Sequence, residues 1–349
     1  MNSIYTIFIV AIIIVTISTW IFFSYNPKKQ KKTDTLYNDA LNAMLRADKF
    51  RAIELLKEIV KQDSGHVDAY LQLGSILRDD NPQRALKIHQ MLTVRPNLSQ
   101  DMRIEIYKSL AVDYEALGDL IKSKKEAEQI LIIEKQNIWA LTFLLKIGEK
   151  IQDWDYAEDK AKRLQKITKK KDSQELAKYL VYRSIEMIKE KNFESAEMLL
   201  NKAIKQSPNY ALPYKYIGEI RAINRDLVKA IENWEKFINL APEDSHQVFE
   251  NMENALFDIG RYSEVEKFYR KVLDNDPLNF AGILRLANVL NEKGEGQAAI
   301  NLIERLIDDG NTEISILLMK LKLSLTIQTP AELGHQIDHI LNKLEYFDD

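Results

Sequence analysis

The sequence predicts an all-α protein, in which an N-terminal transmembrane helix precedes an α-solenoid of about eight helix pairs. Pro208 and Pro242 lie 34 residues apart, and each closes the same pattern of small and bulky residues. The chain contains only 11 Gly and 8 Pro among its 349 residues, so few positions favour turns. No segment shows the sustained alternation of apolar and polar residues that is typical of a half-buried strand.

The repeated pattern places a small residue three positions after a bulky one, with further bulky or small residues before the proline. Its members are Phe193, Ala196, Leu200 and Ala203 before Pro208, and Leu227, Ala230, Trp234 and Phe237 before Pro242. This spacing is typical of tetratricopeptide-type helix pairs. Such pairs stack into scaffolds that bind other molecules along an extended surface. The pattern therefore predicts a binding protein and argues against an enzyme.

The N-terminal segment Ile4–Tyr25 contains no charged residue. As a helix it would measure roughly 33 Å, which is enough to cross a hydrocarbon core of about 30 Å. Lys28, Lys29, Lys31 and Lys32 follow it and should remain on the cytoplasmic side. A cleaved signal peptide is the alternative, but no positive region precedes the apolar run and no small-x-small site ends it. We expect a single-pass anchor with the body on the cytoplasmic side.

The remainder of the chain divides into helix pairs, and the second pair has a turn, Asp79–Gln83, that is one residue shorter than the others. Six pairs are expected at 36–63, 67–96, 104–135, 138–169, 177–208 and 211–242, and two more between Gly260 and Pro277 and between Leu286 and Leu306. Apolar helices at 314–325 and 331–346 follow. The predicted domains are 1–32 (anchor and basic stop), 33–172 (N-terminal half), 173–325 (C-terminal half) and 326–349 (capping helix and tail).

The composition excludes several kinds of chemistry. The chain has no cysteine, which rules out thiolate metal sites, iron–sulfur clusters and cysteine nucleophiles. Its net charge of −3 does not favour nucleic acid. Gly294–Ala299 has the letters of a dinucleotide fingerprint but follows a predicted helix instead of a strand. His335 and His339 share one helix face without enough neighbouring ligands for a metal. We therefore expect no cofactor, no metal and no small-molecule substrate.

The first helices of successive pairs should line the concave side of a solenoid. Aromatic, basic and amide side chains that point from these helices are the candidates for anchoring a partner peptide. The candidate partner-binding residues are Gln72, Arg78, Lys108, Trp139, Phe143, Tyr182, Lys215, Tyr216, Arg285 and Asn288.

The second pair contains a more specific stretch. Leu73-Gly74-Ser75-Ile76-Leu77-Arg78 is followed by Arg84-Ala85-Leu86-Lys87-Ile88-His89-Gln90. Together with the early anchor and with Trp154, Ala157, Ala161 and Arg163-Leu164 of the fourth pair, this stretch resembles the lipopolysaccharide assembly protein B family. The resemblance runs from the anchor to about Leu325.

The resemblance implies an adaptor at the inner membrane that regulates lipopolysaccharide synthesis. In that family the scaffold presents the deacetylase LpxC to the protease FtsH and contacts other lipopolysaccharide assembly proteins. The family also ends in a rubredoxin-like domain with two Cys-x-x-Cys pairs, which a chain without cysteine cannot form. A generic scaffold for secretion, pilus or division machinery, with its body in the periplasm, is the alternative.

Overall fold

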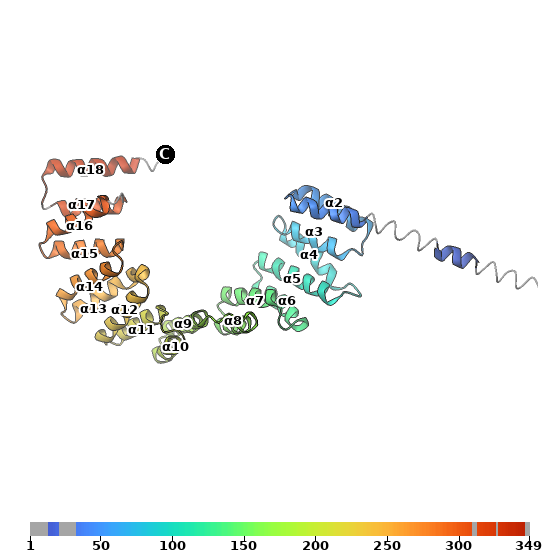
Figure 1. The fold of residues 1–349 in the computed structure, drawn as a ribbon, viewed down its shortest axis with the longest axis horizontal. Helices are drawn as coiled ribbons and strands as arrows, with labels where there is room; N and C mark the ends of the chain where they lie inside the picture. Colours follow the sequence, from blue (N-terminus) through green and yellow to red (C-terminus); the bar gives the residue numbers. More distant parts are fainter. Residues whose placement is uncertain (1–12, 21–32, 309–312, 326, 346–349) are drawn as a thin grey trace, which may run out of the picture. The chain divides into compact units, whose positions relative to one another are not determined.

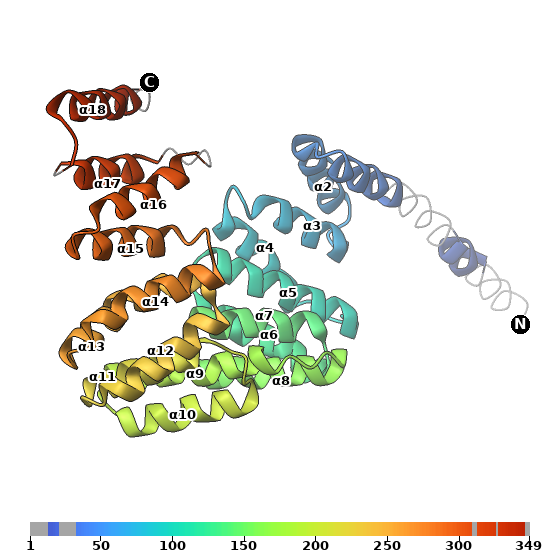
Figure 2. The same cartoon turned by 60° about the vertical axis from the view of Figure 1, so that its left-hand side comes forward.

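The computed structural model describes residues 13–20, 33–308, 313–325 and 327–345. Regular structure in these ranges is helical throughout, without a strand, so the predicted all-α fold is confirmed. Within each compact part of the chain, helices that follow one another pack side by side as hairpins (Figure 1; Figure 2). The arrangement is that of the predicted tetratricopeptide-like helix pairs.

The helices form two compact units, which we name the N-terminal unit, up to Lys171, and the C-terminal unit, from Asp172. The N-terminal unit contains a helix over residues 33–45 and α2 (Lys49–Gln62), α3 (Val67–Leu77), α4 (Pro82–Thr93), α5 (Gln100–Ala116), α6 (Leu120–Ile133), α7 (Ile138–Lys150) and α8 (Trp154–Thr168). The C-terminal unit contains α9 (Ser173–Lys189), α10 (Phe193–Gln206), α11 (Leu212–Ile223), α12 (Leu227–Leu240), the 3₁₀ helix η1 (Pro242–Val248), α13 (Phe249–Asp258), α14 (Tyr262–Asn275), α15 (Phe280–Glu292), α16 (Gly296–Asp308), α17 (Ile314–Ser324) and α18 (Pro330–Glu345). The finer predicted domain boundaries stay a prediction.

A left-handed residue ends the first helix in most pairs. Its positive φ lets the next amide donate to a carbonyl five residues back, which satisfies the end of the helix. In the turn after α9, Lys191 has φ 61° and the Asn192 N–H donates to the Met187 carbonyl over 2.8 Å. The other residues of this kind are Ala47, Gly118, Gln152, Arg225, Gly260 and Gly294. The shorter turn of the second pair has no such residue.

Side-chain caps place two helix starts earlier than the sequence pattern predicts. The sequence pattern predicts that the third pair begins at Ile104, but the Ser99 hydroxyl accepts from the Met102 N–H and α5 begins at Gln100. The pattern predicts that the fifth pair begins at Ala177, but Asp172 caps α9 in the same way and α9 begins at Ser173. A capping oxygen pairs an amide that the helix itself leaves unpaired, so it extends the helix beyond its apolar stripe.

The seventh pair differs from the others because Pro242 opens a 3₁₀ helix, η1, before α13. Asn279, from the start of α15, anchors this segment. Its side-chain amide donates to the Pro242 carbonyl over 3.3 Å and to the buried Ser245 hydroxyl over 3.0 Å. These bonds hold η1, which stands where the other pairs have the first part of a regular first helix.

Two glycines allow a large ring to pack directly against a helix backbone. Gly74 lies against the His89 ring and Gly218 against the Trp234 ring, and a Cβ atom at either position would overlap that ring. In each case a ring nitrogen lies 3.2 Å from the carbonyl oxygen three residues before the glycine, which belongs to Leu71 or Lys215. The same contact thus recurs in the second and sixth pairs.

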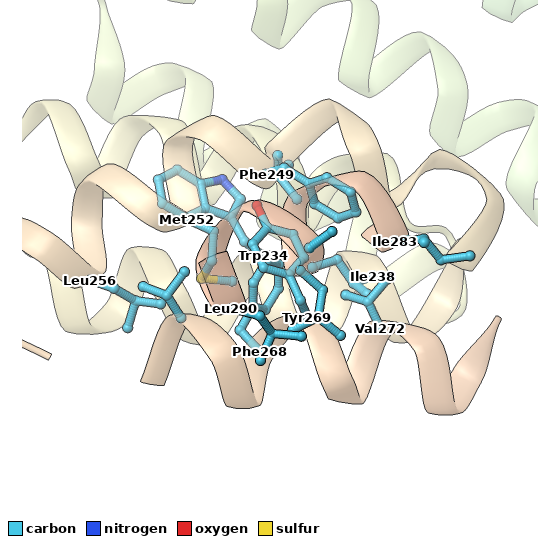
Figure 3. Packing of buried hydrophobic residues seen from close by; sticks show 14 of the residues in the cluster. Trp234, Ile238, Phe249, Met252, Leu256, Phe268, Tyr269, Val272, Ile283 and Leu290 are labelled. Carbon is cyan, nitrogen blue, oxygen red and sulfur yellow. The ribbon is translucent and has the colours of Figure 1, made fainter. Parts of the chain in front are cut away.

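The core of each unit is built between neighbouring pairs. In the C-terminal unit one cluster extends from α12 to α17, and Figure 3 shows its aromatic centre, where Trp234, Phe249, Phe268 and Tyr269 lie together. Phe249 meets Tyr269 edge to face, with ring centroids 5.1 Å apart. Aromatic pairs prefer this geometry, which adds to the gain from burial. Smaller clusters join neighbouring pairs elsewhere.

Among the residues that the structure describes, no helix has the length and apolarity needed to cross a membrane. Most of the predicted anchor Ile4–Tyr25 lies outside those residues. Residues 13–20, which belong to it, are helical.

Gly218 provides a test of the close ring packing. Substitution Gly218→Ala should lower the free energy of unfolding by about 1–3 kcal/mol, because the buried Trp234 ring must move. Gly334→Ala is the matched control: it is also helical, but its Cβ would meet open space. The control should gain about 0.5–1 kcal/mol from helix propensity. Urea unfolding followed by circular dichroism measures both, and equal effects would contradict the packing argument.

Candidate partner-binding surface

The ten predicted partner-binding residues all come from first helices of pairs or from the residue that ends one. Gln72 lies on α3 and Arg78 caps it, Lys108 lies on α5, and Trp139 and Phe143 lie on α7. In the C-terminal unit Tyr182 lies on α9, Lys215 and Tyr216 on α11, and Arg285 and Asn288 on α15. Whether they bind a partner stays a prediction.

In the N-terminal unit, two of the predicted residues form an aromatic pair. The rings of Trp139 and Phe143, one helical turn apart, stack with centroids 4.9 Å apart and an angle of 14°. The Lys108 ammonium, from the neighbouring first helix, lies 5.4 Å from the centre of the Trp139 ring and donates to Glu105 over 2.8 Å. Trp139 is half-buried, whereas Phe143 is buried and packs against the Trp139 ring. Trp139 and Lys108 are therefore the accessible members.

Glu115 binds two lysines of the next first helix. Lys146 and Lys150 of α7 place their ammonium groups 3.0 Å and 2.5 Å from its Oε1. Burial alone would raise the pKa of Glu115, but the hydrogen bonds from Lys150 and Lys146 outweigh it and lower that pKa. Glu115 is therefore a stable anion that joins α5 to α7.

The Arg78 side chain is largely buried and binds a buried carboxylate. Its Nε donates to Asp113 over 2.6 Å, and the second oxygen of this fully buried carboxylate lies 2.5 Å from Nδ1 of His89. A buried carboxylate needs such partners, because desolvating it alone is costly. Arg78 thus joins α3 to α5, and little of its side chain remains accessible to a partner.

In the C-terminal unit, Tyr182, Tyr210 and Tyr216 lie near one another, and Tyr216 lies near the half-buried Glu219. Burial raises the pKa of Tyr210 to about 12, with smaller contributions from Tyr182 and Tyr216. Burial also raises the pKa of Tyr216, with Glu219 and Tyr182 adding to it. For Glu219 burial outweighs the attraction of Lys215 and raises the pKa. Lys215 itself donates to Gln247 in η1 over 2.9 Å.

Arg285 and Asn288 of α15 each bond to a different neighbouring first helix. Arg285 donates to Glu253 of α13 over 2.7 Å, and Glu253 also accepts from the buried Tyr269 hydroxyl over 2.6 Å. The side-chain oxygen of Asn288 accepts from Lys322 of α17 over 2.8 Å. Both residues therefore connect successive pairs.

These contacts form a series that we name the first-helix ties. Four of them join two first helices, the fifth joins α11 to η1, and each spans about one repeat in sequence. The ties are Arg78–Asp113, Lys150–Glu115, Lys215–Gln247, Arg285–Glu253 and Lys322–Asn288. The sequence pattern missed the partners Asp113, Gln247 and Glu253, although a search for complementary side chains 32–35 residues away would have found them. Four of the ten predicted residues take part in these ties: Arg78, Lys215, Arg285 and Asn288.

Within the described ranges, no three His, Asp or Glu side chains converge as they would at a metal site. Aromatic side chains such as Trp139 are the kind of residue that anchors partners at protein interfaces, and binding at this surface stays a prediction.

Two glutamates of this surface should respond oppositely to pH. When folding raises the pKa of a group, that group contributes most to stability at pH values below its ordinary pKa. The contribution is lost as the pH rises through the pKa of the folded state. Glu219→Gln should therefore raise the thermal midpoint at pH 7 and have little effect near pH 4. Glu115→Gln, with its lowered pKa, should reduce the midpoint at pH 7, and this loss should shrink as pH falls. Thermal unfolding across pH measures both, and shifts of the same sign would contradict these environments.

No protein-family model matches the chain. Lipopolysaccharide assembly protein B of Escherichia coli strain K12 is 25% identical over 286 residues, which cover 81% of this chain and 73% of that protein. Lipopolysaccharide assembly protein B of Haemophilus influenzae is 24% identical over 293 residues, which cover 80% and 72%.

Among solved structures, a tetratricopeptide repeat protein from Parabacteroides merdae is 16% identical with a TM-score of 0.38, and the match covers 84% of this chain and 99% of that chain. The sequence similarity extends over most of the helix pairs described above. The chain is thus similar to the lipopolysaccharide assembly protein B proteins over 81% of its length, and the resemblance predicted from its sequence is confirmed.

Proposed function

We propose that this chain is a membrane-anchored scaffold that binds other proteins and acts in lipopolysaccharide assembly. The observation that supports this most directly is the similarity to proteins named lipopolysaccharide assembly protein B over 81% of the chain. The stacked helix pairs support it as well, because their first helices present half-buried aromatic rings beside charged groups. The proposal assigns no reaction to the chain.

The proposed anchor is Ile4–Tyr25, with Lys28 to Lys32 holding the body on the cytoplasmic side of the inner membrane. Charge distribution supports this orientation. Residues 33–171, which follow the basic stop, carry 24 Lys and Arg against 22 Asp and Glu, whereas the residues from Asp172 carry 21 against 30. The less acidic unit is therefore the one that follows the anchor, next to the acidic cytoplasmic leaflet. Tethering would raise the effective concentration of the scaffold toward membrane partners.

The specific proposal is that the scaffold presents LpxC to the FtsH protease and coordinates other lipopolysaccharide assembly proteins. Its support is the family resemblance in the second and fourth pairs. A scaffold that holds an enzyme near a membrane protease would control the amount of that enzyme without chemistry of its own.

Depletion of the chain tests this role. We expect LpxC to accumulate on depletion and to return to its normal level when the wild-type gene is restored, as measured by immunoblot. Lys108→Glu, on the proposed surface, should restore the level poorly. Lys87→Glu on the second helix α4, where the side chain is exposed and has no ion pair within the described ranges, should restore it fully. An unchanged LpxC level on depletion would refute the LpxC proposal.

A generic scaffold for another envelope machine, with its body in the periplasm, is the second candidate. Alkaline phosphatase is active only outside the cytoplasm, so a fusion after Asp349 distinguishes the two. We expect an inactive phosphatase fusion and a fluorescent cytoplasmic reporter at the same position. Phosphatase activity would favour the periplasmic candidate and reverse the proposed orientation.

A further inference from the structure

A polar pocket of about 230 Å³ lies where the second helix pair meets the third in the N-terminal unit. It is lined by Thr93, Arg95, Leu98, Arg103, Ile106 and Tyr107, from the end of α4, the connection after it and the first turns of α5. Leu98 and the buried Ile106 form its apolar part. The remaining four side chains all carry hydrogen-bond donors, and none of the six is acidic.

The two arginines of this pocket differ from the others near the first helices. Arg78, Arg221 and Arg285 each face a carboxylate. Within the described ranges, the side chains of Arg95 and Arg103 make neither an ion pair nor a hydrogen bond. Asp101, two residues before Arg103, is exposed and does not pair with it. The pocket therefore has two positive charges without a protein counter-charge.

Arg95 is held in place before any ligand arrives. Its guanidinium carbon lies 4.6 Å from the centre of the Tyr70 ring, and the residue is half-buried. A guanidinium over an aromatic face is attracted by the ring and loses part of its freedom. The Tyr107 hydroxyl adds a neutral donor, and the positive end of the α5 dipole lies at the same junction.

We propose that this pocket binds a phosphate group, carried by a free phosphate or by a lipid headgroup. A phosphate monoester has close to two negative charges and three terminal oxygens. Two guanidinium forks and a hydroxyl match this set better than a single carboxylate does. The ligand is a small anion and not a protein partner of the surface proposed above, so either proposal can fail without the other.

Isothermal titration calorimetry of the full chain in a non-ionic detergent tests the site, with inorganic phosphate as the probe. Loss of one charge-assisted hydrogen-bonding group should weaken binding about tenfold or more. We expect this for Arg95→Gln and for Arg103→Gln, and no measurable binding in the double variant. Arg84→Gln, an exposed arginine of α4 outside the pocket, is the matched control and should bind as the wild type does.

Short-chain phosphatidic acid distinguishes the two sources of phosphate. Binding that is at least about tenfold tighter than that of inorganic phosphate, with the same dependence on both arginines, would assign the site to a lipid headgroup. Equal affinities would assign it to free phosphate. Absence of binding by the wild type, or binding that the double variant retains, would overturn the proposal. Arg103 is exposed, so Arg103→Gln tests the site even if Arg95→Gln impairs folding.

Discussion

The structure depends on the fact that a single helix pair cannot bury its own apolar surface. In the C-terminal unit the buried cluster runs through α12 to α17, so each pair contributes half of a layer that its neighbour completes. Trp234 is almost fully buried because it lies between α11 and the next pair. Nearest-neighbour burial of this kind is what makes stability in stacked repeats a sum of local terms.

The stretch that carries the family resemblance has a structural explanation. Gly74 provides space for the His89 ring, His89 contacts Asp113, and Arg78 closes the network from the other side. A buried polar network of this kind is stable only if all its members are present. Most of this stretch therefore packs the second pair against the third, whereas Trp139 and Lys108 remain accessible.

The sequence predicted the helix pairs well, because the spacing of apolar residues follows the buried face of each helix and the prolines mark where pairs end. It predicted turns less well. Ala47, Gln152, Lys191 and Arg225 adopt the left-handed conformation without being glycine, so a search for glycine does not find them. The predicted surface residues lie on first helices as expected, but spacing along one helix does not reveal a partner such as Asp113 one repeat away. Nor did it reveal the pocket with Arg95 and Arg103, whose donors meet only when two pairs stack.

The first-helix ties have a mechanical consequence. A ligand that recruits Lys215 or Arg285 must first release Gln247 or Glu253, so its net affinity falls by the strength of the bond it displaces. Without that bond, the two helices would be freer to move relative to one another. Ligand binding at one tie would therefore change the mobility of the helices at the next tie, so that binding at one place would influence other places in the same unit.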